Sequence, residues 1–221
     1  VGITHPSTKV ARERALACVE VGAAAVMVSP SPGMAAGPAL KSHFQRIAAD
    51  LPIPFIIQDH PTSSGVKMPV EFIAGLFDSM PPNSVVKLED PPTALKIRKL
   101  LELAPNYQIL GGLGGVSLLH ELDAGSHGTM TGFALPEILV GIVKAHQAGN
   151  RDEAKRIFEA AMPLMVFEAQ PGAGVALRKE LLKRRGALAH ATVRQPAPTA
   201  DPFMLELLDE LLATAPIGAT T

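Results

Sequence analysis

The feature that most constrains the fold is an alternation of short apolar runs with segments of helical periodicity across residues 1–149. The apolar runs are continuous rather than alternating with polar residues, as expected where both faces of a sheet are covered. The segments between them place apolar residues three and four positions apart, which predicts helices. Predicted strands are 1–4, 24–30, 53–59, 84–89, 107–112 and 128–133, and predicted helices are 9–21, 38–50, 69–79, 92–104, 115–125 and 136–149.

Six βα units of this kind predict an α/β protein with a parallel sheet, wound either as an open sheet or as a closed barrel. After residue 150 the pattern changes to helices alone, predicted at 151–170, 173–187 and 203–215. We therefore predict two regions, a βα-repeat body over 1–149 and a helical region over 150–221. A basic cluster in the second of these helices is interpreted as a solvated face; it consists of Lys179, Lys183, Arg184 and Arg185.

Composition and motifs exclude several classes of function. The formal net charge of −1 gives no basic field for nucleic acid or for a membrane surface. No apolar run approaches the ~18 residues of a transmembrane helix. The single cysteine, Cys18, cannot form an intrachain disulfide, which favours a reducing, cytoplasmic location. We find no dinucleotide or phosphate-loop motif and no metal-ligand spacing, and we expect no metal and no cofactor.

The ends of the predicted strands are where a βα barrel keeps its chemistry. Lys87, in the stretch "SVVKLEDPPT", is the only lysine at these ends. An amine in apolar surroundings gives up its proton more readily than in water, and the free amine can attack a ketone to form a Schiff base. The alternative is an ordinary strand-end lysine that reaches water, and the motif alone does not separate the two.

Other acidic and basic residues at the strand ends allow two interpretations. Asp59 and His60 are candidates for an acid/base pair, but Asp59 could instead cap a turn before Pro61 and His60 could point to solvent. Glu89 and Asp90 are interpreted as caps of the following helix, because carboxylates suit the positive end of a helix dipole.

Taken together, segments of the chain resemble the dihydrodipicolinate synthase / N-acetylneuraminate lyase family of class I aldolases, from Val1 to about Asp209. The matching segments are "VMVSPSPG", "LKSHFQRIAADLPIPFIIQDHPTSSGV", "VVKLEDPPT", "ILGGLGG", "GSHGTMTGFALPE" and "AGNRDEAKRIFEAAMPLM". The resemblance implies a TIM (β/α)8 barrel, of which strands 3 to 8 are present, with a C-terminal helical extension. It also implies a homo-oligomer, a tetramer or dimer, that acts on pyruvate or a related 2-keto acid through a lysine imine.

The same resemblance assigns roles to individual residues. Lys87 matches the imine-forming lysine, and Gly112 and Met130 match positions that contact the bound keto acid. Gln58 stands where the family has a tyrosine proton relay; its carboxamide can bind substrate by hydrogen bonds but cannot relay a proton by ionising. Three more departures remove the arginine clamp and the tyrosine pair of true dihydrodipicolinate synthases, at Ser63, Ser31 and Pro32.

These departures argue against dihydrodipicolinate synthesis. They favour a lyase, an aldolase or dehydratase, that acts on pyruvate or a sugar-derived 2-keto acid, with Asp59 and His60 as replacement acid/base candidates. Two alternatives remain: a catalytically silent relative that binds a small keto acid in a regulatory role, and an open-sheet protein without imine chemistry. Because the match begins at the family's third strand, we expect the two preceding units, with their carboxylate-binding threonine pair, in a longer gene product.

Overall fold

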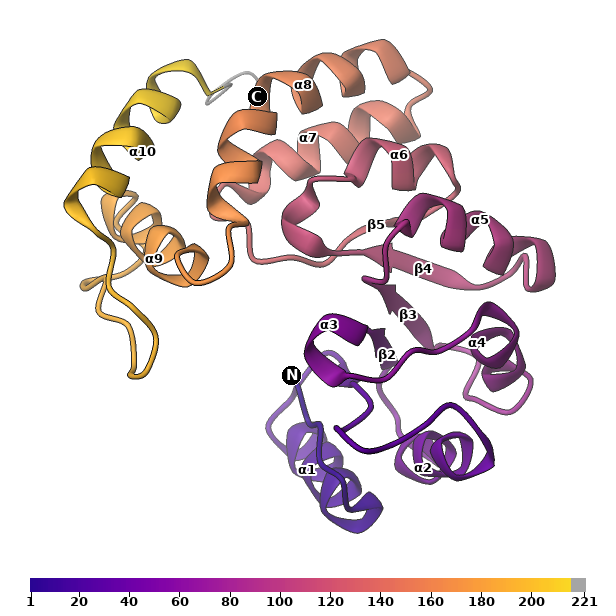
Figure 1. Cartoon of the computed structure of the whole chain (residues 1–221). Helices are drawn as coiled ribbons and strands as arrows, with labels where there is room; N and C mark the ends of the chain where they lie inside the picture. The colour runs from indigo at the N-terminus through magenta and orange to yellow at the C-terminus, as the bar shows by residue number, and fades with distance from the viewer. Residues whose placement is uncertain (216–221) are drawn as a thin grey trace. The chain divides into compact units, whose positions relative to one another are not determined.

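The computed structural model of the chain describes residues 1–215 and confirms the α/β prediction (Figure 1). Within these residues five strands form one sheet in the sequential order β1-β2-β3-β4-β5, and β1 to β4 pair in parallel. The strands are β1 (Val26–Val28), β2 (Phe55–Asp59), β3 (Val85–Leu88), β4 (Gln108–Gly111) and β5 (Gly128–Thr129). Each new strand is added on the same side of the last one, as in a barrel, whereas doubly wound open sheets reverse direction.

The first and last predicted strands are shorter than expected. Residues 1–4 contribute only a parallel bridge between Gly2 and Met27, supported by a 2.9 Å hydrogen bond from the Ile3 N–H to the Met27 carbonyl. The strand predicted over 128–133 ends at Thr129. Beyond it the chain bonds elsewhere, since the Thr131 hydroxyl accepts a 2.8 Å hydrogen bond from the Gly114 N–H.

The helices follow the predicted periodicity closely. They are α1 (Thr8–Glu20), α2 (Pro38–Ala48), α3 (Pro61–Ser64), α4 (Val70–Phe77), α5 (Thr93–Leu103), α6 (Leu118–Asp123), α7 (Pro136–Gln147), α8 (Arg151–Glu168), α9 (Gly174–Arg184) and α10 (Pro202–Thr214). Proline occupies the first turn of α2, α7 and α10, where its missing N–H costs nothing. The prediction missed α3, a single turn that Pro61 begins and that ends at Gly65 with a left-handed φ of 71°.

The chain divides into two compact units, each with its own apolar core. The first unit comprises Val1–Gly111 and Asp123–Gly128, and the second comprises Gly112–Leu122 together with the described residues from Thr129 onward. In the first unit the strands pack with the helix pairs α1/α2 and α4/α5, around side chains such as Phe44. In the second unit α8 packs against α7, α9 and α10. The predicted boundary between residues 149 and 150 stays a prediction.

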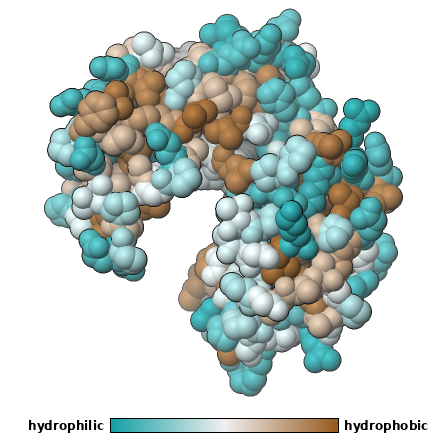
Figure 2. Space-filling view, in the orientation of Figure 1, coloured by the Kyte–Doolittle hydropathy of each residue, from teal (hydrophilic) through white to brown (hydrophobic). Residues whose placement is uncertain are grey.

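The surface combines charged and apolar side chains. Figure 2 shows apolar side chains between hydrophilic ones on the visible face, and the large apolar residues left exposed include Val140, Val166, Val175 and Phe203. No helix within residues 1–215 is long and apolar enough to cross a membrane.

The basic cluster of α9 is more than a solvated face. Lys183, Arg184 and Arg185 are exposed as predicted. Arg184 nevertheless binds both Glu180 and Asp209, which joins α9 to α10. Arg185 lies 2.9 Å from the Glu137 carboxylate and donates to the Ala134 carbonyl, which joins the end of α9 to the start of α7.

Candidate active site

The candidate site lies in the first unit, where β2 and β3 end side by side. The parallel register places Gln58 opposite Lys87 and Asp59 opposite Leu88. Both strands consist of buried apolar residues up to these positions, so the polar side chains begin only where the strands end. Successive residues of a strand point to opposite faces of the sheet. Gln58 and Lys87 therefore share one face, and Asp59 and Leu88 share the other.

Lys87 is buried and makes an ion pair. Its side chain is 11% exposed, and its Nζ lies 3.0 Å from Oε2 of Glu89, whose side chain is 7% exposed. The carboxamide of Gln58 donates a 2.6 Å hydrogen bond to the same Glu89 oxygen. An ammonium, a carboxylate and a carboxamide thus meet at one point, and the burial of Lys87 contradicts the alternative interpretation of a strand-end lysine that reaches water.

Glu89 is the site residue that the sequence interpretation missed. It was predicted to cap the following helix, but α5 begins after Pro92 and has no side-chain cap. The spacing of Lys87 and Glu89 contained the signal, because residues two apart on a strand face the same side. The Glu89 N–H also donates a 2.8 Å hydrogen bond to the Asp59 carbonyl, which extends the pairing of β2 and β3 to this point.

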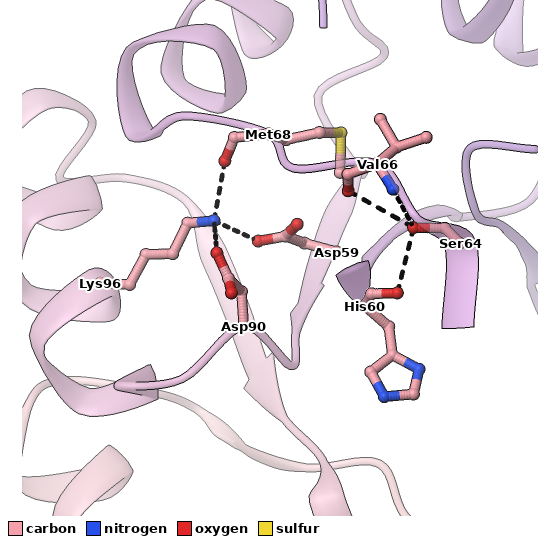
Figure 3. A network of polar contacts seen from close by, with 7 residues as sticks. All are labelled: Asp59, His60, Ser64, Val66, Met68, Asp90 and Lys96. Atoms are coloured by element: carbon pink, nitrogen blue, oxygen red, sulfur yellow. Dashed lines mark hydrogen bonds and ion pairs between the residues drawn. The ribbon is translucent and has the colours of Figure 1, made fainter. Parts of the chain in front are cut away.

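Asp59 and Asp90 bind a second lysine, Lys96 of α5. The Lys96 Nζ lies 2.6 Å from Oδ2 of Asp59, 2.8 Å from Oδ2 of Asp90 and 2.7 Å from the Met68 carbonyl oxygen (Figure 3). Asp59 therefore does not cap the turn before Pro61, and Asp90 does not cap α5. We name these four residues the Lys96 network.

The Asp59 carboxylate is enclosed by protein. Its side chain is 0% exposed, and its Oδ1 has no hydrogen-bond partner among the described residues. Burial raises the pKa of Asp59 above its usual range, and the hydrogen bond and positive charge of Lys96 oppose that rise. This position favours a structural role for Asp59 over the predicted role in acid/base chemistry.

His60 lies at the start of α3. Its Nδ1 is 2.7 Å from the Ser63 hydroxyl, and Figure 3 shows its ring pointing away from the Lys96 ammonium. The Ser64 hydroxyl donates to the His60 carbonyl and accepts from the Val66 N–H, which fixes the turn. The acid/base role of His60 stays a prediction.

Gly112 and Met130, the other predicted substrate contacts, belong to the second unit. Gly112 is buried and precedes a 3₁₀ turn over Leu113–Gly115, whereas Met130 is half-buried. Within this turn a Cβ at Gly115 would lie 2.9 Å from Leu139 Cδ2, and its φ of 80° is left-handed. The glycine-rich stretch is thus required by backbone conformation and packing, and the two predicted substrate contacts remain predictions.

The described residues contain no group of three or more His, Cys, Asp or Glu side chains that could hold a metal ion. The polar groups gathered at the ends of β2 and β3 are instead an amine, a carboxylate and an amide. Such a set can form an imine and transfer protons.

Comparison with known proteins gives one consistent family. The sequence profile of the Dihydrodipicolinate synthetase family matches residues 1–215. The chain is 31% identical to an L-2-keto-3-deoxyarabonate dehydratase of Azospirillum brasilense over 97% of its own length and 70% of that protein. It is 28% identical to a 4-hydroxy-tetrahydrodipicolinate synthase of Oleidesulfovibrio alaskensis over 77% of its own length and 60% of that protein.

The solved structures agree with the sequence matches. The crystal structure of dihydrodipicolinate synthase from Rhodopseudomonas palustris superposes with a TM-score of 0.88 at 32% identity, over 97% of this chain and 73% of that one. This match confirms the fold class predicted from the resemblance, a (β/α)8 barrel with C-terminal helices. The chain therefore belongs to the dihydrodipicolinate synthetase family of lyases.

Proposed function

We propose that the protein is a lyase that forms an imine between Lys87 and a sugar-derived 2-keto acid, and that it dehydrates this substrate. One observation carries the proposal: the Glu89 carboxylate is held between the Lys87 ammonium at 3.0 Å and the Gln58 carboxamide at 2.6 Å. The similarity to a 2-keto-3-deoxyarabonate dehydratase supports the substrate class and the choice of dehydration over aldol cleavage.

The geometry supports the first step, imine formation. Lys87 must be neutral to attack a ketone, and Glu89 lies close enough to accept the ammonium proton. The free amine then forms a bond to C2 of the keto acid, and the C2 oxygen leaves as water once it has been protonated. The imine withdraws electrons from the C3–H bonds of the substrate, so that one of these protons can be removed to give an enamine.

The second step is loss of the C4 hydroxyl. The enamine electrons expel this group, and a proton from a general acid converts it to water, so that the substrate has lost one water molecule when the imine is hydrolysed. Glu89 is the ionisable group best placed to transfer these protons. Gln58 cannot ionise, and we assign it the role of orienting Glu89 where the family has its tyrosine.

We also propose that the protein is a cytoplasmic homo-oligomer, a tetramer or dimer, whose partner is a small 2-keto acid. The single cysteine supports a reducing location. Exposed apolar side chains on α7, α8, α9 and α10 supply surface for contacts between copies; they are Val140, Val166, Val175 and Phe203. Light scattering on the purified protein measures the oligomeric state directly, and a monomer at micromolar concentration would contradict this part of the proposal.

Borohydride trapping tests the imine. The protein is incubated with pyruvate or with a panel of 2-keto acids that includes 2-keto-3-deoxyarabonate, reduced, and mapped by peptide mass spectrometry. We expect a reduced adduct on Lys87, no adduct in Lys87→Met, and an undiminished adduct in the control Lys99→Met, which changes an exposed lysine of α5. Absence of a Lys87 adduct with every acid would overturn the proposal and favour a relative that only binds keto acids.

A further inference from the structure

The Lys96 network contains the residues that directly follow two residues of the candidate site. Asp59 directly follows Gln58, and Asp90 directly follows Glu89. Lys96 binds the carboxylates of both aspartates, at 2.6 and 2.8 Å. The Lys96 ammonium therefore links Asp59 to Asp90. The residues that directly precede these two aspartates, Gln58 and Glu89, are hydrogen-bonded to each other.

The network lies on the opposite face of the sheet from the candidate site. Asp59 points away from the face of Gln58 and Lys87, because neighbouring strand residues alternate. Lys96 reaches Asp59 from α5, and its side chain is 11% exposed. Figure 3 shows the Lys96 ammonium surrounded by Asp59, Asp90 and the Met68 carbonyl. Helix α5 thus binds the end of β2 on the face of the sheet opposite to Gln58 and Lys87.

The ammonium has no bonding capacity left for another partner. Lysine carries three N–H donors, and Lys96 has three acceptors between 2.6 and 2.8 Å. An ion pair with Asp59 alone would leave the loop after β3 free to move. The additional bond to Asp90 fixes that loop one residue after Glu89. The bond to the Met68 carbonyl fixes the segment between α3 and α4.

We propose that Lys96 is a positioning residue for the imine chemistry, which holds Glu89 against Lys87 and Gln58 through Asp90 and Asp59. This inference rests on the proposed function, because it assigns Lys96 a part in the same reaction. The Lys96 ammonium binds Asp59, Asp90 and the Met68 carbonyl. It acts on the reaction through these residues.

Two variants separate positioning from simple stability. Asp90→Asn weakens the link next to Glu89 and keeps the Lys96–Asp59 pair, and the Asp90 side chain is 22% exposed, so we expect it to fold. Lys96→Met combined with Asp59→Asn removes the network while it leaves the net charge unchanged. Lys99→Met, an exposed lysine of the same helix, is the matched control.

The first measurement is kcat per trapped Lys87, which counts only folded sites. We expect both variants to lose about 10- to 100-fold, because displacement of a catalytic group by about 1 Å is this costly. Lys99→Met should equal the wild type. A network that served stability alone would lower the yield of folded protein and leave kcat per trapped site unchanged, and that result would overturn the proposal.

The second measurement needs no substrate. Lys87 is labelled with acetic anhydride at one fixed pH, and its extent of labelling is read by mass spectrometry. The Glu89 carboxylate holds the Lys87 Nζ at 3.0 Å in a buried ion pair, so displacement of Glu89 should expose the amine and raise the extent of labelling. The double variant keeps the net charge of the protein, so a rise in labelling there reports a change of geometry around Lys87. If the wild type forms no adduct, the proposed function fails, and this labelling alone decides whether Lys96 holds Glu89 in place; unchanged labelling in both variants rejects that role.

Discussion

At the scale of single residues, the chemistry depends on the carboxylate of Glu89. We expect Glu89→Gln to lower kcat by about 10²- to 10⁴-fold, because the amide keeps the shape of the side chain but cannot accept or return a proton. Steady-state dehydration of the preferred 2-keto acid measures the loss. Borohydride trapping at long incubation should still give the Lys87 adduct, since the amine itself remains.

Glu102→Gln is the matched control for this substitution. Glu102 lies on α5 with a side chain 67% exposed and only a 3.8 Å ion pair to Arg98, so its change should leave kcat within about twofold. Retention of full dehydration activity by Glu89→Gln would contradict the role of Glu89 and would favour His60 as the acid/base residue.

The sequence identifies some of these residues and not others, for physical reasons. Lys87 could be singled out because it is the only lysine at the predicted strand ends, and the family resemblance of the segments on both sides assigns it the imine role, which stays a prediction. Glu89 was assigned to a helix cap because acids beside prolines often begin helices, although its spacing from Lys87 allowed the correct interpretation. The contact between Asp59 and Lys96 spans 37 residues and has no local pattern that predicts it.

At the scale of elements, Glu168 performs in the second unit the joining role that Lys96 performs in the first. The Glu168 side chain is 1% exposed at the end of α8 and lies 2.7 Å from Arg178 Nε of α9. It also accepts a 3.0 Å hydrogen bond from the Ala134 N–H, just before α7. One carboxylate therefore connects three helical segments that are distant in sequence.

We expect Glu168→Gln to lower the free energy of unfolding by about 1–3 kcal/mol, because it weakens the hydrogen bonds that the buried Glu168 carboxyl group makes with Arg178 and Ala134. Burial raises the pKa of Glu168, against the opposing effects of Ala134 and Arg178. The folded state then keeps a proton that the unfolded state loses above about pH 4.3, so the Glu168 contribution to stability falls as pH rises. Glutamine does not titrate.

The stability difference between wild type and Glu168→Gln should therefore be largest at acidic pH and shrink toward neutrality. Urea denaturation at several pH values measures it. The control Glu159→Gln changes a residue of the same helix whose side chain is 63% exposed, and it should alter neither stability nor its pH dependence measurably. A difference that grows with pH would mean that Glu168 is already ionised in the folded protein at low pH.

Elements differ in how well the sequence predicts them, according to their length. The long helices, such as α8, repeat their apolar spacing over several turns, and their observed ends lie within a few residues of the predicted ones. The strand predicted over 128–133 was too long, because the chain after Thr129 bonds elsewhere, as in the hydrogen bond from the Gly114 N–H to the Thr131 hydroxyl. The single turn α3 has no periodicity at all, and only Pro61 and Gly65 mark its ends.

At the scale of the whole molecule, the division into two apolar cores has consequences for cooperativity. One core includes Ile73 of α4, and the other includes Leu164 of α8. Both side chains are at most 1% exposed, so truncation of either one to alanine should cost about 2–5 kcal/mol. A unit with its own core can lose protection against hydrogen exchange as a cooperative block.

We therefore expect hydrogen exchange to separate the two units. Ile73→Ala should raise exchange mainly in β1 to β4 and their helices, and Leu164→Ala mainly in α7 to α10, as read by mass spectrometry of peptides. The controls Leu95→Ala on α5 and Glu159→Ala on α8 truncate side chains that are 50% and 63% exposed, and should leave exchange unchanged. Equal loss of protection across both units in each core variant would show that the two cores unfold as one block, because a shared transition spreads any local destabilisation over all of its members.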